Sequence, residues 1–399
     1  MRIQRISLLG LTLLFACDDS YKPPPRPPAP VTQTPAPTPT PAPKPAPAPA
    51  KPVPPPDPMI ALAARGGHTC GLRKSGAVAC WGKNTDGQLG DGTRSDMPRA
   101  VTVPGLSDIS ELSVGLLSSC VRKRNGQVLC WGNNEDGQLG DGKGAKPGAR
   151  STTPVAVQGI NDATQLSAGD GHVCALRRAG TVSCWGLGGD GQLSAVSERS
   201  PQPRAIAGLT GVAQIASGGN HVCARKQTGA VVCWGRNTEG QLGDGASGSK
   251  IKPVAVKGLT DAVDLVAGGT HTCAKRRAGG VVCWGANSNG QLGDGTTGTF
   301  AQRTPVAVQG LSSLAQLALG REHSCARFDD GKVSCWGSNK QGQLGDGSTT
   351  SRAKPTPVAR LSDATDLALG TAHSCALQRS GNVTCWGSDE HRALGPRHL

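Results

Sequence analysis

Short apolar runs broken by glycine recur along the chain after residue 59. The segment DLVAGGTHTCAKRRAGGVVCWG (264–285) is typical, and it shows no helical period longer than one turn. A further short run, TPVAVQG (304–310), follows after a loop. The pattern predicts roughly four short β-strands per unit. One ends near the paired glycines, two surround the cysteines, and one carries the Pro-Val pair.

Cysteine and tryptophan show how often this unit occurs. Of the 15 cysteines, all but Cys17 form pairs whose members are ten positions apart, and each second cysteine is followed by Trp-Gly, which uses all 7 tryptophans. The spacing predicts seven copies of one unit. The pairs are Cys70 and Cys80, Cys120 and Cys130, Cys174 and Cys184, Cys223 and Cys233, Cys273 and Cys283, Cys325 and Cys335, and Cys375 and Cys385.

The spacing of each cysteine pair also fixes a hairpin register. If Cys70 lies opposite Cys80, a three-residue loop Lys74–Gly76 joins the strands, and such loops favour glycine in the third position. Glycine stands there in every copy, and the cysteines then form a non-hydrogen-bonded pair, about 4.5 Å apart between Cα atoms. We therefore predict seven cross-strand disulfides. Cysteine as a small buried residue and zinc ligation by cysteines of different units are the alternatives.

Seven units of short antiparallel strands favour radial closure into a β-propeller. The segment GTHTCAKRRAGGVVCWGANSNGQLGDG (269–295) resembles the regulator-of-chromosome-condensation repeat in its glycine and histidine before the first cysteine, its Trp-Gly and its Gly-Gln-Leu-Gly-x-Gly turn. The resemblance covers residues 59–399. It implies an all-β, seven-bladed propeller of four-stranded antiparallel blades, with the tryptophans anchoring neighbouring blades.

The chain departs from this family pattern in four ways. Ser118 replaces the histidine in copy two, GQLSAVS replaces GQLGDG in copy three, and copy seven ends DEHRALG. The paired cysteines are additions. A Pro-Val strand follows copies one to six but not copy seven, so either blade seven has three strands or residues before Met59 supply the fourth. PVPPPDP (52–58) suits a strand poorly, and we expect weak closure there.

The first residues predict export. Arg2 and Arg5 precede an apolar run that is too short to span a membrane, and LFAC (14–17) resembles the lipoprotein signal of bacteria. We expect a signal peptide over 1–16 and a lipid on Cys17. The Pro-rich residues 17–58 then form a disordered, semi-rigid linker before the propeller at 59–399. This places the protein at the cell envelope, attached to a membrane by the lipid, at the outer membrane or cell surface rather than the inner membrane.

Polar residues that recur once per unit predict structure rather than chemistry. The recurrent histidine is either one of a ring of metal ligands or bases, or a structural residue bonded to the backbone of its own turn, and we favour the second. The Asp-rich turns lack the spacing that calcium needs, so no metal or cofactor is expected. The histidines are His68, His172, His221, His271, His323 and His373.

Charge is more informative, because the chain carries a formal net charge of +14. Basic residues gather in the cysteine hairpins, which lie on one face of a propeller. The aspartates of the Gly-Gln-Leu-Gly-Asp-Gly turns lie on the opposite face. Aspartates between the blades partly neutralise the basic face. The candidate binding face consists of Arg73, Lys74, Arg122, Lys123, Arg124, Arg177, Arg178, Arg225, Lys226, Lys275, Arg276 and Arg277, and the equivalent hairpins also supply Arg327 and Arg379.

These features predict a non-enzymatic protein-binding scaffold, a lipid-anchored propeller on a stalk at the bacterial envelope. The partner would be an envelope protein of acidic character rather than nucleic acid, because the tryptophans are committed to the core, and the chain would be a monomer. A propeller-type inhibitor of an envelope or secreted enzyme is one alternative. An envelope polysaccharide-acting enzyme is another, with Asp190, Glu198, Glu390 and His391 as its unrepeated candidates. Guanine-nucleotide exchange is the least expected, since export separates the chain from cytoplasmic GTPases.

Overall fold

The computed structural model describes residues 22–28, 57–195, 198–298 and 301–395. The chain divides into two units, 1–54 and 55–399. In the first unit only residues 22–28 are described, and they are exposed and without regular secondary structure. The predicted signal peptide, Cys17 and most of the predicted linker lie outside the described residues. Within the described ranges, no helix is long and apolar enough to cross a membrane.

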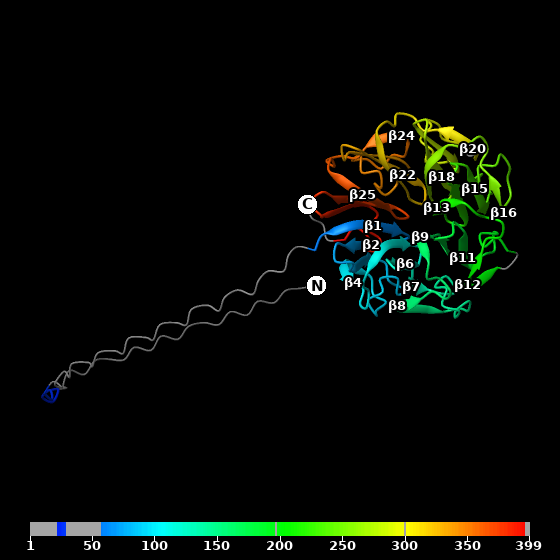
Figure 1. The fold of residues 1–399 in the computed structure, drawn as a ribbon. Coiled ribbons are helices and arrows are strands. Elements are labelled where there is room, and N and C mark those ends of the chain that lie inside the picture. Colours follow the sequence, from blue (N-terminus) through cyan, green and yellow to red (C-terminus); the bar gives the residue numbers. More distant parts are fainter. Residues whose placement is uncertain (1–21, 29–56, 196–197, 299–300, 396–399) are drawn as a thin grey trace, which may run out of the picture. The chain divides into compact units, whose positions relative to one another are not determined.

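The second unit contains every strand of the described residues, 27 in seven antiparallel sheets (Figure 1). Each sheet is one blade and takes its strands consecutively from the chain. The strands are β1 (Met59–Arg65), β2 (His68–Arg73), β3 (Val78–Gly82), β4 (Met97–Thr102), β5 (Ile109–Val114), β6 (Ser118–Lys123), β7 (Val128–Asn133), β8 (Arg150–Ala156), β9 (Ala163–Ala168), β10 (His172–Arg177), β11 (Val182–Leu187), β12 (Arg199–Ala205), β13 (Val212–Ser217), β14 (His221–Lys226), β15 (Val231–Gly235), β16 (Lys250–Ala255), β17 (Ala262–Ala267), β18 (His271–Arg276), β19 (Val281–Gly285), β20 (Gln302–Ala307), β21 (Leu314–Leu319), β22 (His323–Phe328), β23 (Val333–Gly337), β24 (Arg352–Pro357), β25 (Ala364–Leu369), β26 (His373–Gln378) and β27 (Val383–Gly387).

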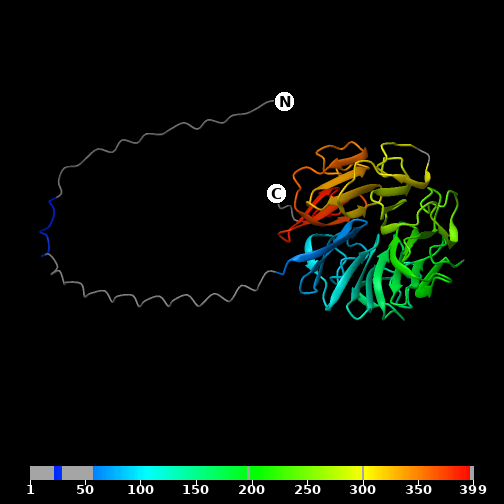
Figure 2. The same cartoon turned by 45° about the horizontal axis from the view of Figure 1, so that its top comes forward.

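The first strand of each blade faces the axis of the propeller. Each of these strands contacts the first strand of the next blade, and β25 contacts β1, so the ring closes (Figures 1 and 2). Together they line a central channel of about 300 Å³. The Pro-Val strands, such as β8 and β16, lie outermost, where the missing N–H group of proline is tolerated.

The cysteine hairpins have the predicted register. Cys70 pairs with Cys80 between β2 and β3, and Arg73 N donates to the Ala77 carbonyl at 2.8 Å, which leaves Lys74–Gly76 as the loop. Gly76 has φ 87°, the left-handed conformation that this loop requires. All seven predicted disulfides are present, with Cα atoms 4.0 to 4.1 Å apart. The prediction of seven disulfides is confirmed.

The hydrophobic core lies between blades rather than in the channel. In the contact of blades three and four, Val222 and Trp234 pack against Leu176 and Val182, all of them buried. The tryptophan also makes a polar contact across the interface, since Trp234 Nε1 donates to the Gln192 carbonyl oxygen at 2.8 Å. The Gly-Gln-Leu-Gly segment of one blade is therefore inserted against the tryptophan of the next. Scaffold and inter-blade anchor are the roles that the sequence predicts for these residues.

Blade seven has three strands, β25, β26 and β27, in the described part of the chain. Of the two possibilities left open by the sequence, the described residues show the first, because Asp57 and Pro58 precede β1 outside any strand. Closure uses other contacts. Trp81 Nε1 donates to the Ala393 carbonyl at 3.1 Å, and Leu62 N donates to Asp366 Oδ2 at 2.8 Å. Ala393 stands where the other turns have glutamine, so DEHRALG reproduces the contact despite its different sequence.

Candidate functional site

The recurrent histidines link each blade to the next. His271 Nε2 lies 2.9 Å from Ser324 Oγ, which donates to the Gln291 carbonyl at 2.9 Å. The single hydroxyl hydrogen is thus used, so Nε2 is the donor to Oγ. The histidine is structural, as favoured from the sequence, but its expected partner was wrong: it is a side chain of the next blade. The other pairs are His68 with Ser119, His221 with Thr272, His323 with Ser374 and His373 with Thr69.

Burial keeps these histidines neutral. It lowers the pKa of His373 to about 4 and the pKa of the other five to about 3. Neutral, fully buried rings cannot act as bases toward a substrate in solvent. The described residues contain no group of three or more His, Cys, Asp or Glu side chains that could hold a metal ion.

Blade two lacks the recurrent histidine, and blade three lacks the hydroxyl residue that this histidine would contact. Blade two has Ser118 instead of histidine, and the next blade has Val173 instead of a hydroxyl residue. In blade four, Val222 stands at the position of the hydroxyl residue, and both ring nitrogens of His172 lack a hydrogen-bond partner among the described residues. A hydroxyl residue directly after the histidine of the next unit is the sequence signal that would have identified this contact.

The aspartates of the Gly-Gln-Leu-Gly-Asp-Gly turns hold their own loops. Asp91 Oδ1 accepts from Asn84 Nδ2 at 3.2 Å and from Thr93 N at 2.9 Å. The same asparagine contact holds four other aspartates, so the acidic side chains are turn residues rather than a free cluster. They are Asp141, Asp244, Asp294 and Asp346.

The predicted basic residues lie on one face, which we call the hairpin face because it carries the turns between the second and third strands of every blade. Many of them have structural partners. Arg122 Nε lies 2.7 Å from Glu111, and Arg177 Nε and Arg276 Nε lie 2.7 Å and 2.9 Å from the inter-blade Asp162 and Asp261. The other partnered residues are Arg73 with the Asp57 carbonyl, Arg225 with Gln214, Lys275 with the Leu314 carbonyl, and Arg327 with Gln316.

The first residues of the three-residue hairpin loops stay exposed. They form a ring of equivalent residues, five of them cationic, with Gln227 and Asp329 in blades four and six. We call the five cations the hairpin ring. They are Lys74, Arg124, Arg178, Arg277 and Arg379.

Lys123 and Lys226 end their strands on the hairpin face and are half-buried. The structure therefore divides the predicted face into partnered residues, which hold the blades, and exposed ones, which are available to a partner.

An arginine side chain crosses the central channel near the end that lies away from the hairpin face. Arg65 takes the position at which the six other blades have glycine, and its Nε lies 2.9 Å from Asp170 of blade three, while Nη1 donates to the Ser217 carbonyl at 3.3 Å. Burial alone would raise the pKa of Asp170, but the charge of and hydrogen bond from Arg65 outweigh it and lower the pKa. This ion pair ties blade one to blades three and four.

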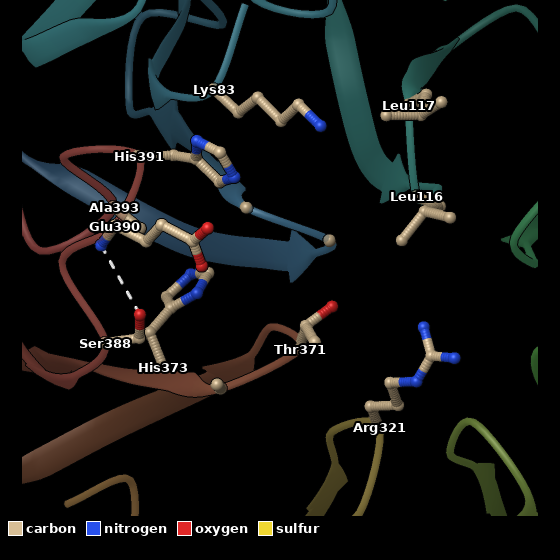
Figure 3. A pocket seen from close by; sticks show the side chains of 13 residues that line it. Lys83, Leu116, Leu117, Arg321, Thr371, His373, Ser388, Glu390, His391 and Ala393 are labelled. Atoms are coloured by element: carbon tan, nitrogen blue, oxygen red, sulfur yellow. Dashed lines mark hydrogen bonds between the residues drawn. The ribbon is translucent and has the colours of Figure 1, made fainter. Parts of the chain in front are cut away.

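A cavity of about 330 Å³ opens on the face opposite the hairpins, where blades one, two, six and seven meet (Figure 3). We call this the closure pocket. Lys83, Arg321, Thr371 and His391 extend into the space between the blades, with Leu116 and Leu117 on one side. His391 Nδ1 lies 3.6 Å from Asp96 Oδ2. Glu390 and His391, two unrepeated neighbours in the sequence that the sequence analysis indicated, both line this pocket.

The two other unrepeated candidates lie elsewhere, in blade three. Asp190 N donates to Gln192 Oε1 at 2.9 Å, and the Glu198 carbonyl accepts from Gly188 N at 2.6 Å, so both belong to the loop between β11 and β12. Sequence reasoning missed Lys83 and Arg321. Comparison of the repeats does not single them out, because both positions vary from blade to blade and Arg236 of blade four is a second cation at the position of Lys83.

A search against family descriptions matches the RCC1-like domain over residues 32–312 and 98–398. The chain belongs to the RCC1-like domain family. Its fold is similar to that of yeast RCC1 (Prp20), solved with Kap60, at a TM-score of 0.71 and 21% identity, covering 86% of this chain and 82% of that one. No curated protein matches the chain by sequence.

Two further solved structures extend this comparison. Human WBSCR16 aligns at a TM-score of 0.71 and 23% identity, covering 80% of this chain and 87% of that one. The ectodomain of the receptor kinase CR4 from Physcomitrella patens aligns at a TM-score of 0.54 and 23% identity, covering 83% and 74%. At these identities the likeness shows the fold alone. A study of Prp20p from Saccharomyces cerevisiae, at 20% identity, describes its binding to Gsp1p and histones.

Proposed function

We propose that this RCC1-like propeller is a non-enzymatic protein-binding scaffold at the bacterial envelope, and that the hairpin ring holds an acidic partner protein. The observation that carries the proposal is that some polar residues are bonded within the scaffold while others are exposed on one face. The repeated histidines and turn aspartates are committed to the scaffold, whereas Lys74, Arg124 and Arg178 and their equivalents are exposed on one face. A ring of like charges attracts an oppositely charged surface.

A protein suits this face better than nucleic acid. Single-stranded nucleic acid is held by exposed aromatic rings interleaved with cations. Here Trp131, Trp185 and Trp234 are fully buried between blades, and Trp386 is half-buried. Protein binding by the family member Prp20p, which its study describes for Gsp1p and histones, supports the same class of function. Inhibition of an envelope or secreted enzyme is a narrower form of it.

We also propose that a lipid on Cys17 attaches the propeller to the outer membrane or cell surface. The lipoprotein-like LFAC sequence supports this, and seven disulfides are typical of an oxidising compartment. A Cys17→Ser variant should lose labelling by a radioactive fatty acid and move from the detergent phase to the aqueous phase. Unchanged partition would contradict the anchor.

The test of partner binding is a crosslinking pulldown from envelope extract with the exported, oxidised chain. One variant replaces the five cations of the hairpin ring with serine. A matched control replaces five exposed cations that lie off the hairpins, namely Arg99, Lys146, Lys252, Lys340 and Lys354. We expect an acidic protein to be enriched by the wild type and the control, lost with the ring variant, and weakened by salt. The same list from all three baits would overturn the proposal.

A further inference from the structure

The closure pocket is built from residues that the repeat does not supply. His391 stands where the other six turns have Asp86, Asp136, Asp190, Glu239, Asn289 and Gln341. Leu116 and Leu117 take positions that are glycine in blade one. The propeller does not need these residues for its fold, because the other blades form without them. Unrepeated polar and apolar side chains that converge on one cavity indicate a binding site.

Two cations define the charge of this pocket. Among the described residues, the side chains of Lys83, which is half-buried, and Arg321, which is exposed, have no ion pair or hydrogen bond. The charge of Arg321 also acts on Asp170, which Arg65 already pairs. Figure 3 shows both side chains reaching toward the same open space. Glu390 contributes the one carboxylate of the lining, and His391 is already beside Asp96. The lining therefore has an excess of positive charge that a ligand can neutralise.

Apolar groups form the rest of the lining. The hydrocarbon surface comes from Leu116, Leu117, Ala372 and Ala393. The ring of His391 lies against Gly67, and a Cβ atom on residue 67 would lie only 2.7 Å from His391 Cδ2. A fully hydrated inorganic anion would leave this surface wet. An anion on a hydrocarbon stem would cover it while its charge meets Lys83 and Arg321.

We propose that the closure pocket binds a carboxylate carried on an apolar stem, with Arg321 and Lys83 holding the carboxylate and the two leucines contacting the stem. The volume, about 330 Å³, suits the side chain and terminus of a single residue. A small free acid and the C-terminal residue of a partner protein present this same chemistry. The site is on the face opposite the hairpin ring and is independent of the function proposed above.

Isothermal titration of the oxidised full-length chain tests the proposal with three probes. N-acetyl-leucine represents the small acid, a hexapeptide ending in a leucine carboxylate represents a C-terminus, and the same peptide as the C-terminal amide removes the charge. We expect saturable binding of one or both acids and none of the amide. Binding of the peptide acid alone assigns the site to a partner's terminus. Binding of neither acid, or of amide and acid alike, would overturn the proposal.

Variants identify the site. Lys83→Gln and Arg321→Gln should each weaken binding of the acid by about tenfold to a hundredfold, because each removes a charge-assisted hydrogen bond. Glu390→Gln should tighten binding by removing a like charge. Lys340→Gln removes an exposed cation at the position equivalent to Glu390 in blade six, and it should leave the affinity unchanged. A loss with Lys340→Gln as large as that with Lys83→Gln would show nonspecific charge attraction and overturn the proposal.

The hairpin-ring variant separates this site from the proposed partner surface. It should bind N-acetyl-leucine or the peptide acid with wild-type affinity, whatever the outcome of the pulldown. Thermal unfolding of each glutamine variant under oxidising conditions shows that it is folded. An acid affinity that falls with the hairpin-ring variant would place the binding elsewhere.

Discussion

Blades four and seven share the cysteine hairpin and its Trp-Gly but have different surroundings. In blade four, β15 lies between β14 and β16, and Cys233 and Trp234 are completely buried. In blade seven, β27 pairs only with β26 in the described chain, and Cys385 and Trp386 are half-buried. The repeat motif therefore fixes the hairpin and its disulfide, while burial depends on the outer strand that the adjoining sequence supplies.

The open side of β27 presents backbone groups that are bonded in the other blades. In blade four, the Val231 carbonyl accepts from Val256 N at 3.0 Å. Val383 is the equivalent residue in blade seven, and none of the described residues outside β26 pairs with its strand. The cluster of buried apolar residues between blades seven and one is also smaller than those of the other interfaces, and consists of Leu62, Trp81, Ala368, Cys375 and Leu377. Blade seven is thus the weak point of the ring.

Acidification should have the largest effect on stability. The pKa of each buried histidine lies below the ordinary value of 6.5, so the unfolded chain binds more protons between pH 6.5 and about 3. Stability is complete above that window and falls as the pH falls through it. From pH 7 to 5.5 the six histidines together should cost about 7 kcal/mol of unfolding free energy.

Circular dichroism with guanidinium at each pH measures this loss. Blade seven should open first, because its third strand has no outer neighbour in the described chain. A His172→Ser variant, which copies Ser118 of blade two, should reduce the pH dependence by about a sixth. A stability that is flat from pH 7 to 5 would contradict buried neutral histidines.

Removing the inter-blade tryptophan should have the next largest effect. Trp234→Ala deletes a buried ring and the bond to the Gln192 carbonyl, and it should cost about 3–5 kcal/mol. Trp386→Ala removes the same side chain, but the ring of Trp386 is half-buried, so we expect a loss of about 1–3 kcal/mol of unfolding free energy. Denaturation of the two oxidised variants measures the difference. Equal losses would mean that blade seven is as well covered as blade four.

The disulfides should differ in accessibility. Each closes a short loop and should stabilise the chain by about 2–3 kcal/mol. Because Cys385 is half-buried and Cys233 is fully buried, Cys375–Cys385 should be reduced before Cys223–Cys233. Stepwise reduction, alkylation and mass spectrometry give the order. Simultaneous reduction of both bridges would show that the chain opens as a whole rather than at blade seven.

The smallest effect concerns a single backbone conformation. Arg392 has φ 58° where the equivalent Gly342 of blade six has φ 76°. Arg392→Gly should stabilise the protein by about 0.5–1 kcal/mol, because glycine adopts this conformation without a steric cost. Arg379→Gly is the matched control, an exposed arginine of the same blade whose φ is not positive, and it should give no gain. Thermal unfolding distinguishes the two.

Much of the fold follows from local rules, which is why the sequence predicts it. Ten-residue cysteine spacing and glycine at the third loop position specify one hairpin register, and the repetition of Trp-Gly specifies the number of blades. Trp234 could be assigned to a blade interface because the family resemblance implies that role for the recurrent tryptophan, whereas its bond to the Gln192 carbonyl was not predicted. These inferences need only neighbouring residues or the comparison of one repeat with the next.

The closure pocket could not be predicted in the same way. Lys83 and His391 are brought together by ring closure, about three hundred residues apart along the chain. The basic face was predicted as a set, but only the structure separates Arg177, which is paired with Asp162, from Arg178, which is exposed. That distinction depends on rotamers and inter-blade distances, which periodicity does not encode.

Crosslinking mass spectrometry of the envelope complex tests the central claim most directly. An amine-reactive crosslinker reads out lysines, and the two faces carry different ones: Lys74 and Lys226 on the hairpin face, Lys83 and Lys340 on the opposite face. We predict that crosslinks to the partner fall on Lys74 and Lys226, and that the Lys226 crosslink disappears in the hairpin-ring variant, which keeps Lys226 and lacks Lys74. Crosslinks concentrated on Lys83 and Lys340 would contradict the claim that the hairpin face binds the partner.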